Sequence, residues 1–350
     1  MKSNYDPLGK HIRLVDYRNS EEVTSTVLGI SIDKEFMPSV ANVIGTDLSR
    51  YKLISKGLFA CNPMHVGRDE RLPIALYEKD SPAIVSPAYF MFEIIDRDVL
   101  SEEYLMMWFR RPEFDRECWF MTDGSVRGGI TWDDLCRIKL PVPSYARQCE
   151  IVESYRAITD RIALKRAEND NLEAVLAASH SKMFFSKDTS EHTKLGELMT
   201  FGNGKSRPKT DGPIPVYGGN GVLSYTDHHN IENAVLIGRV GAYCGSVYLE
   251  QGICWVSDNA IFAKSKITKD EFFDYFLLKR LNLFNHHVGT GQQLLTQEIL
   301  NNIEVPKPVT EQIELFNRKA ASVFETIFTN SREIIRLQEL SDLLLSRLAG

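Results

Sequence analysis

A segment of this 350-residue chain occurs twice. Residues 124–183 return position for position at residues 289–348, a constant offset of 165 residues. A repeat of this length indicates that the fold is built from two copies of one module. Each copy ends in a Pro-x-Pro element followed by a long helix pattern, so we expect the order globule, helix, globule, helix. The matched positions are Gly124 and Gly289, Ser125 and Thr290, Ile130 and Leu295, Thr131 and Thr296, Leu135 and Leu300, Ile138 and Ile303, Pro141 and Pro306, and Pro143 and Pro308.

Apolar residues after each Pro-x-Pro element recur at steps of three and four, which is the spacing of a coiled-coil seam. Two matched seams in one chain should pair with each other. The alternative is two separate surface helices, each packed on its own globule. The first predicted seam contains Ile151, Tyr155, Ile158, Ile162, Asn169, Leu172 and Leu176. The second contains Phe316, Val323, Ile327, Asn330, Ile334, Leu337 and Leu344.

The direction of the helix pair follows from the duplication. A duplicated module closes most simply about a pseudo-twofold axis, which makes the two helices antiparallel. Pairing the helix midpoints makes the numbers of partner residues sum to about 499, so Asn169 should face Asn330. A buried Asn pair costs stability but penalises a slipped register. A helix of some 33 residues would span about 50 Å, or one to one and a half turns of B-DNA.

Short β-branched runs broken by glycine predict strands and tight turns in both globules. A helical stretch follows these runs near residues 101–111 in the first globule and at 269–283 in the second. We therefore expect an α+β fold with two tandem, pseudo-twofold related globules and two long helices that form an antiparallel coiled coil. The expected boundaries are 1–143 for the first globule, 144–188 for the central helix, 189–308 for the second globule and 309–350 for the C-terminal helix.

The charge balance argues against binding nucleic acid by bulk electrostatics. The chain has 47 acidic and 41 Lys or Arg residues, a formal net charge of −6, whereas such binding calls for a basic face. The six cysteines are scattered and are expected to be reduced. Because the sequence shows neither a secretion signal nor a long apolar run, we expect a cytoplasmic protein with no membrane partner.

Several segments together resemble the specificity subunit of type I restriction-modification systems. Their order, repeated twice and joined by two heptad helices, is more specific than any single motif. They are the strand 84–89 leading to Glu102-Glu103-Tyr104-Leu105, the turn Pro215-Val216-Tyr217-Gly218-Gly219-Asn220-Gly221, the strand Ile237-Gly238-Arg239-x-Gly241, the loop Gly289-Thr290-Gly291-Gln292-Gln293, and both Pro-x-Pro-to-helix junctions.

This resemblance implies a DNA sequence-specificity subunit that is not itself an enzyme. Each globule would be a target recognition domain that reads one half of a bipartite double-stranded DNA target. The helices would fix the spacer and dock methyltransferase subunits, and restriction subunits through them. We expect no cofactor on this chain; S-adenosylmethionine, ATP and Mg²⁺ belong on the partner subunits. The first copy departs from the pattern, since Gly124-Ser125-Val126-Arg127-Gly128-Gly129 replaces the Gln-containing loop.

Base reading requires Arg, Lys, Asn or Gln side chains on loops, with phosphate contacts from nearby cations. Gln292 and Gln293 suit adenine or phosphate positioning, and Arg127 suits guanine or phosphate. A solvated turn is the alternative for the 202–209 loop, turn geometry for residues 217–220 and 289–293, a core position for Tyr243, and a surface ion-paired loop for Arg68 and Arg71. The DNA-binding candidates are Lys205, Arg207, Lys209, Tyr217, Asn220, Arg239, Tyr243, Gln292, Gln293, Arg68, Arg71, Ser125 and Arg127.

Other activities find less support in the sequence. The Gly-Lys-Ser at 204–206 lacks the first glycine of a phosphate-binding loop, because Met199 stands there. The His pairs at 228–229 and 286–287 lack companion ligands, so we expect no metal site. The chain shows neither a cofactor-binding glycine turn nor a methyltransferase motif. A non-catalytic scaffold that uses its helix pair for subunit assembly, without DNA readout, is the main alternative.

Overall fold

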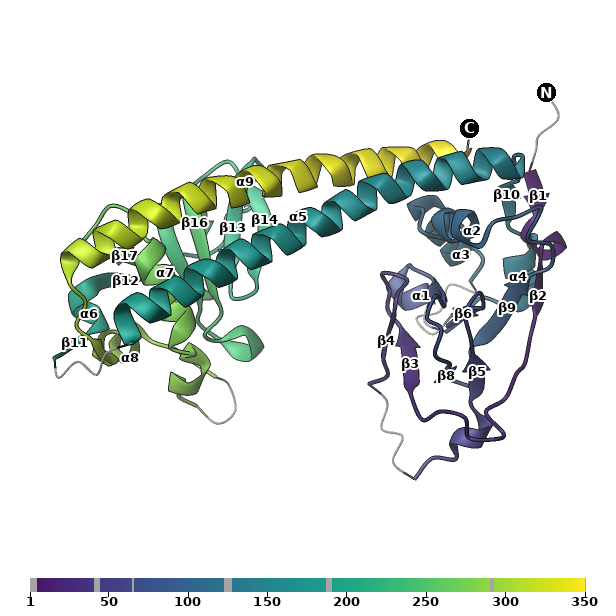
Figure 1. The fold of residues 1–350 in the computed structure, drawn as a ribbon, viewed down its shortest axis with the longest axis horizontal. Coiled ribbons are helices and arrows are strands. Elements are labelled where there is room, and N and C mark those ends of the chain that lie inside the picture. Colours follow the sequence, from purple (N-terminus) through teal and green to yellow (C-terminus); the bar gives the residue numbers. More distant parts are fainter. Residues whose placement is uncertain are drawn as a thin grey trace. The chain divides into compact units, whose positions relative to one another are not determined.

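The computed structural model describes residues 5–40, 45–64, 66–122, 128–186, 191–289 and 293–349, and it separates into two compact units (Figure 1). Unit 1 comprises Met1–Leu164 and Glu333–Gly350, and unit 2 comprises Lys165–Arg332. Two long helices, α5 (Tyr145–Phe185) and α9 (Thr310–Ser346), each contribute one segment to each unit. The α+β class with two globules is confirmed, whereas the four predicted segment boundaries remain a prediction.

Unit 1 contains two small sheets. The first has the antiparallel order β2 (Ile12–Leu14), β9 (Phe90–Ile94), β6 (Phe59–Cys61) and β7 (Ile74–Leu76). The second has the order β4 (Phe36–Pro38), β3 (Val27–Ile30), β8 (Ala83–Val85) and β5 (Lys52–Ile54). A further pair joins β1 (Tyr5–Pro7) to β10 (Lys139–Pro141). The shorter helices are α1 (Val66–Asp69), α2 (Glu102–Phe109), α3 (Pro112–Phe120) and α4 (Trp132–Arg137).

Unit 2 is organised around one six-stranded sheet. Its order is β12 (Met199–Asn203), β17 (Ala260–Ser265), β15 (Ile231–Gly238), β16 (Val247–Val256), β13 (Ile214–Gly218) and β14 (Gly221–Thr226). Strand β13 pairs parallel to β16, and the other neighbours are antiparallel. A separate pair joins β11 (His192–Lys194) to β18 (Glu304–Pro306). The short helices are α6 (Leu195–Leu198), α7 (Phe272–Arg280) and α8 (Gln297–Asn302).

The sequence repeat is also a structural repeat. The order β2-β9-β6-β7 in unit 1 corresponds to β12-β17-β15-β16 in unit 2, and the pair β1-β10 corresponds to β11-β18. The backbone N–H of Leu8 donates to the carbonyl of Ile138 at 2.8 Å, and that of Leu195 donates to Ile303 at 2.9 Å. Offsets of 187 residues at the start of the module and 165 at its end therefore describe the same contact twice. Unit 2 adds the hairpin β13-β14, where unit 1 has a second sheet instead.

Helix ends within the repeat follow local chemistry. Thr131 and Thr296 are N-caps of α4 and α8, and each hydroxyl accepts a hydrogen bond from a backbone N–H three residues later. Ser101 caps α2 in the same way. Helix α7 is shorter than the predicted 269–283 stretch, because Asn282 adopts a left-handed backbone with φ of 46° and such a residue terminates a helix. A short 3₁₀ turn, Leu283–His286, follows.

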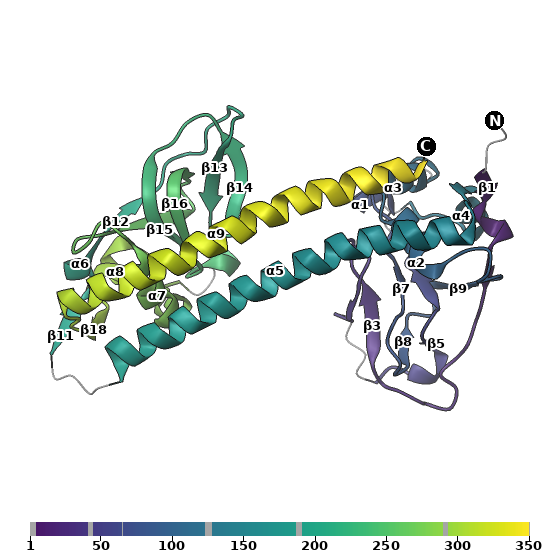
Figure 2. The ribbon, with the colours of Figure 1, turned by 45° about the horizontal axis from the view of Figure 1, so that its top comes forward.

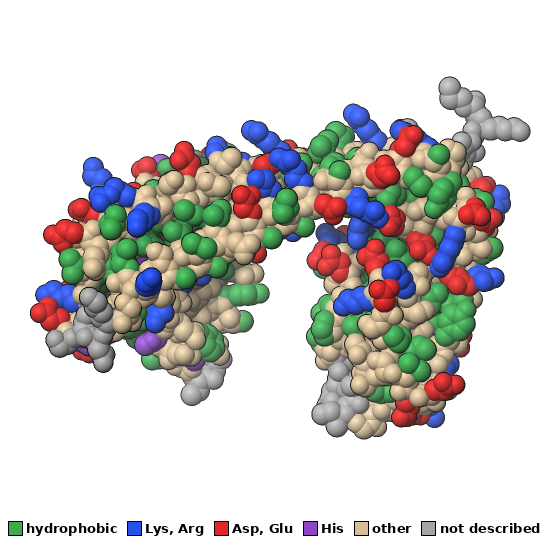
Figure 3. Space-filling model, viewed as in Figure 1, with side chains coloured by type: hydrophobic (Ala, Val, Ile, Leu, Met, Phe, Trp, Pro, Cys, Tyr) green, Lys and Arg blue, Asp and Glu red, His purple; other side chains and the backbone are tan. Residues whose placement is uncertain are grey.

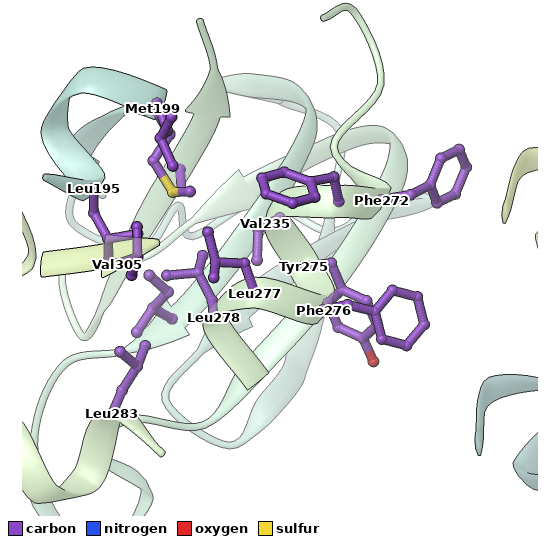
Figure 4. Close-up of a cluster of buried hydrophobic side chains, with 14 of the residues drawn as sticks. Leu195, Met199, Val235, Phe272, Tyr275, Phe276, Leu277, Leu278, Leu283 and Val305 are labelled. Atoms are coloured by element: carbon purple, nitrogen blue, oxygen red, sulfur yellow. The ribbon is translucent and has the colours of Figure 1, made fainter. Parts of the chain in front are cut away.

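Both long helices complete the hydrophobic core of each unit. In unit 2, α7 and the sheet supply most of the cluster drawn in Figure 4, and Leu176 of α5 and Phe316 of α9 belong to the same cluster. In unit 1, Val152 of α5 and Leu345 of α9 pack in the main cluster. Removal of apolar area from water, worth about 25 cal/mol per Å², therefore holds the helix segments on the globules as well as on each other.

Within each unit the segments of α5 and α9 pair antiparallel, as predicted (Figure 2). In unit 2 the amide of Asn330 donates to Asn169 Oδ1 at 2.9 Å, so the predicted Asn–Asn contact is present. Lys165 Nζ donates to Asn330 Oδ1 at 2.9 Å. In unit 1, Arg161 forms an ion pair with Glu333. The fourteen residues assigned to the seam are all buried or partly buried.

Candidate nucleic-acid interface

Several strand ends of unit 2 meet at one edge of its six-stranded sheet. The N–H of Lys205, just after β12, donates to the carbonyl of Val256 at 2.9 Å. The N–H of Ser257 donates to the carbonyl of Tyr217 at 2.8 Å, and the N–H of Arg239 donates to that of Asn259 at 3.0 Å. These bonds gather segments that are far apart in the sequence. We define the loop cluster as residues 203–205, 217–220, 239–245, 257–259 and 293–295.

The segment before α8 joins this cluster through a small ladder. Leu294 forms isolated β-bridges with Val240 and Val288. The N–H of Gly241 donates to the carbonyl of Gln293 at 3.1 Å, and the N–H of Leu295 donates to that of Arg239 at 2.9 Å. Gln293 is therefore held beside the Arg239 loop. Gln292 lies outside the described residues.

Two glycines allow the loops to approach this closely. A Cβ atom at Gly238 would lie 2.1 Å from the carbonyl oxygen of Tyr243, so a larger residue would push the 239–245 loop away. Gly245 has φ of +85°, and a Cβ there would lie 2.4 Å from the backbone nitrogen of Phe284. Ser246 Oγ donates to the carbonyl of Gly219 at 2.5 Å, which fixes the hairpin turn against the same loop. The cluster is thus anchored by backbone packing.

The structure brings only part of the predicted cationic loop into the cluster. Lys205 and Arg207 are exposed on the segment that leaves β12, and Asn220 is exposed at the tip of the β13-β14 hairpin. Lys209 is also exposed, but its neighbour Thr210 hydrogen-bonds Thr226 at the opposite, open end of that hairpin. A single ligand contact for the whole 202–209 loop is therefore not what this geometry favours.

Arg239 differs electrostatically from the other candidates. Its backbone is fixed on both sides by hydrogen bonds, yet its Nε atom is buried and donates to no atom in the described part of the chain. Leaving a buried donor unsatisfied costs about 1–3 kcal/mol. The arrangement is that of a guanidinium positioned before its acceptor arrives.

The two tyrosine candidates have different surroundings. The Tyr217 hydroxyl donates to Glu250 Oε2 at 3.0 Å, and burial, reinforced by the Glu250 carboxylate, raises the pKa of Tyr217. This phenol therefore stays protonated and is already engaged within the sheet. Tyr243 is 52% exposed, so the core position considered for it is wrong.

In unit 1 the two described arginine candidates are ion-paired. Arg68 Nε lies 2.7 Å from Asp69 Oδ1, and Arg71 Nη1 lies 3.2 Å from Asp33 Oδ1. This is the surface ion-paired alternative, and such exposed pairs are typically worth under about 1 kcal/mol. Ser125 and Arg127 lie outside the described residues.

The framework of the corresponding site in unit 1 is nevertheless present. The N–H of Ile130 donates to the carbonyl of Pro63 at 3.1 Å, which matches the bond from Leu295 to Arg239 in unit 2. Pro63 therefore occupies the place of Arg239. The two units keep one scaffold and present different side chains on it, as expected of modules that read different targets.

Sequence reasoning overlooked the segment 257–259. Ser257, Asp258 and Asn259 separate the apolar strands β16 and β17, and this polar triplet between apolar runs is a recognisable turn signal. Asp258 and Asn259 are exposed, while Ser257 is buried and its Oγ has no partner within the described residues. Asn203, also exposed, begins the cluster at the end of β12.

The surface shows no broad positive field. On the face of unit 1 drawn in Figure 3, acidic and basic side chains intermingle, in keeping with the net charge of −6. Any attraction of a polyanion must therefore come from local groups such as those of the loop cluster. Among the residues the structure describes, no group of three or more His, Cys, Asp or Glu could hold a metal ion.

No helix within the described ranges is long and apolar enough to cross a membrane.

Comparison with known proteins agrees with this architecture. Residues 187–343 match the family model for the type I restriction modification DNA specificity domain. The type I restriction enzyme EcoprrI specificity subunit of Escherichia coli is 24% identical over 219 residues, which cover 57% of this chain and 53% of that protein. The chain thus spans about half the length of this curated relative.

The fold comparison extends over both units. The type I restriction-modification system S subunit from M. genitalium superposes with a TM-score of 0.59 at 15% identity, over 98% of this chain and 95% of that one. This likeness establishes a shared fold, and the domain match places the sequence within a family. The chain belongs to the type I restriction-modification specificity subunit family.

Proposed function

We propose that this protein is the DNA sequence-specificity subunit of a type I restriction-modification complex. Each recognition domain reads one half of a bipartite target in double-stranded DNA. The helix pair sets the spacer between the half-sites and docks methyltransferase subunits, which in turn recruit restriction subunits. The observation that carries this proposal is the loop cluster of unit 2, where exposed polar and cationic side chains surround Arg239 and its unsatisfied Nε donor.

The chemistry of the loop cluster suits base reading. Arginine can donate two parallel hydrogen bonds to O6 and N7 of guanine in the major groove, and asparagine can bond adenine bidentately. Arg239 and Asn220 supply these two side chains on loops whose backbones are fixed. Lys205 and Arg207 lie on the adjoining segment and would neutralise phosphates. An acceptor on DNA would also satisfy the Arg239 donor, which recovers its desolvation cost.

The helix pair supports the role of a spacer. A pair fixed in register by the Asn169–Asn330 contact cannot slide without leaving a buried amide unpaired. Its length would then be set by the number of residues in each helix.

We infer that the chain acts without catalysis of its own. Methyl transfer from S-adenosylmethionine and DNA cleavage with ATP and Mg²⁺ are assigned to the partner subunits. The contribution of this chain is sequence readout, phosphate positioning and assembly.

The direct test selects DNA with the intact protein. The full chain, alone and with its methyltransferase subunits, is incubated with duplexes that carry a randomised central region, and the bound molecules are sequenced. Two short conserved blocks at a fixed spacing are expected, and methylated positions in the host genome should map to the same blocks. Binding that is indifferent to sequence and salt, together with intact subunit assembly, would contradict DNA reading.

The second candidate function is a scaffold that assembles subunits and reads no DNA. The excess of acidic residues favours it, since a net charge of −6 repels a polyanion. Arg239→Ala separates the two candidates. DNA selectivity should fall at one half-site only if the chain reads DNA, whereas a scaffold would retain all partner assembly and show no selectivity to lose.

A further inference from the structure

Each unit displays one large aromatic side chain at the same position of the repeat. Trp119 in unit 1 is 45% exposed, and Phe284 in unit 2 is 41% exposed. They are separated by 165 residues, the offset of the duplicated module. Single exposed apolar residues are ordinary on protein surfaces. Two at one repeated position are less ordinary, because nothing in core packing requires them.

The local structure around the two aromatics is the same. The preceding residues, Cys118 and Leu283, are buried in the cores of their units. The N–H of Thr122 donates to the Trp119 carbonyl at 3.1 Å, and the N–H of His287 donates to the Phe284 carbonyl at 3.3 Å.

The side chain three residues later repeats the contact in each unit. Thr122 Oγ1 donates to the Trp119 carbonyl at 2.8 Å, and His287 Nδ1 lies 2.5 Å from the Phe284 carbonyl. Because a carbonyl only accepts, His287 must carry its proton on Nδ1 in this contact. One backbone device therefore holds an aromatic ring outward in both recognition domains.

Both aromatics adjoin the candidate DNA-reading loops. The backbone of Phe284 packs against Gly245 at the end of the 239–245 loop, and Val288, four residues on, bridges to Leu294 at the edge of the loop cluster. The segment 282–288 contains no acidic residue. In unit 1, Trp119 stands shortly before the 124–129 segment that carries Arg127.

We propose that Trp119 and Phe284 are DNA wedges, one for each half-site, whose rings insert against a base step beside the bases that are read. This inference rests on the proposed function. Apolar side chains that enter a base step unstack it and kink the duplex, and aromatic stacking on bases recovers part of the cost. Specificity then includes the deformability of a step that no hydrogen bond contacts.

The test uses the full chain bound to the duplex that it selects from the randomised pool. 2-Aminopurine, whose fluorescence rises when it is unstacked, is placed at successive steps within and beside each half-site. The wild-type protein should raise the signal at one step of each half-site. Trp119→Ala should abolish the rise at one half-site only, and Phe284→Ala at the other only. Each should weaken binding about tenfold, as expected for loss of one base–aromatic contact.

Matched controls separate a wedge from a structural role. Trp119→Phe and Phe284→Trp keep an aromatic ring and should retain the signal. Tyr17→Ala in unit 1 and Tyr225→Ala in unit 2 remove side chains that are 52% and 57% exposed in other parts of each unit, and should leave it unchanged. Unfolding midpoints of all variants verify that the fold is intact.

The outcomes are distinguishable. If the wild-type chain selects no sequence, the proposed function fails and the wedges fail with it. If selection succeeds but both alanine variants keep the wild-type unstacking signal, DNA reading stands and the wedge inference is overturned. Loss of methyltransferase association with an unchanged DNA signal would also overturn it, because the rings would then serve a protein interface.

Discussion

The contact between Asn169 and Asn330 allows a quantitative test of how the helix pair keeps its register. Asn330 is 3% exposed, and its amide donates to Asn169 at 2.9 Å and to Glu168 at 3.1 Å, while its oxygen accepts from Lys165 at 2.9 Å. The bond between the two amides contributes about 1 kcal/mol. The two bonds to charged partners contribute about 0.5 kcal/mol each, because Glu168 and Lys165 are partly exposed and solvent screens them.

Asn330→Ala should therefore lower the free energy of unfolding of the helix pair by about 2 kcal/mol. Asn169→Ala should cost about 1 kcal/mol, since it loses the amide bond and two long contacts at 3.5 Å. The double variant should cost about 1 kcal/mol less than the sum of the single variants, because the two changes remove the same bond. Urea unfolding of the four proteins gives this coupling energy. Additive costs, with coupling near zero, would refute the assigned contact.

The same pair predicts a difference between stability and register. Replacing both Asn169 and Asn330 by Leu should raise the unfolding midpoint, because two apolar side chains replace a buried polar pair. The register should at the same time become less unique. Disulfide trapping between cysteines introduced at positions 162 and 337 reports the native level, and a pair at 162 and 344 reports a slip of one heptad. A leucine variant that crosslinks only at the native level would show that the amides do not set the register.

Three further perturbations follow from the structure. Insertion of one heptad at matched levels of α5 and α9 should lengthen the selected spacer by about three base pairs with both half-sites unchanged, since seven residues add about 10 Å; altered half-sites at constant spacing would refute the spacer role. Arg239→Ala should weaken recognition of one half-site by about 1–3 kcal/mol, while Lys209→Ala, its exposed control, should change no base preference in the same selection assay. Burial raises the pKa of Asp274 to about 7 from 3.8, so the folded state holds a proton that the unfolded state has released across this range, and the free energy of unfolding should fall as pH rises from about 4 to about 7. Asp274→Asn should remove that slope in urea unfolding at several pH values, and a slope that persists would assign it to other groups.

The sequence by itself determined the large-scale organisation, because a duplicated module leaves a periodic record. The 165-residue offset, the Pro-x-Pro elements and the heptad spacing all depend on local chemistry that repeats along the chain. They predicted two α+β globules, an antiparallel helix pair and the pairing of Asn169 with Asn330. These features need no knowledge of loop paths, since seam residues are fixed by the 3.5-residue period and helix ends by caps such as Thr131 and Thr296.

Only the tertiary structure decided which loop residues share a site. Lys205 and Lys209 are four positions apart, yet one joins the loop cluster and the other lies near the open end of a hairpin. Arg239 and Asn259 come together through strand ends that no sequence period records. The paired exposure of Trp119 and Phe284 likewise depended on burial, which is decided by the packing of distant segments. Local periodicity therefore encodes the frame of this protein, while its reading surface arises from long-range backbone hydrogen bonds between loops.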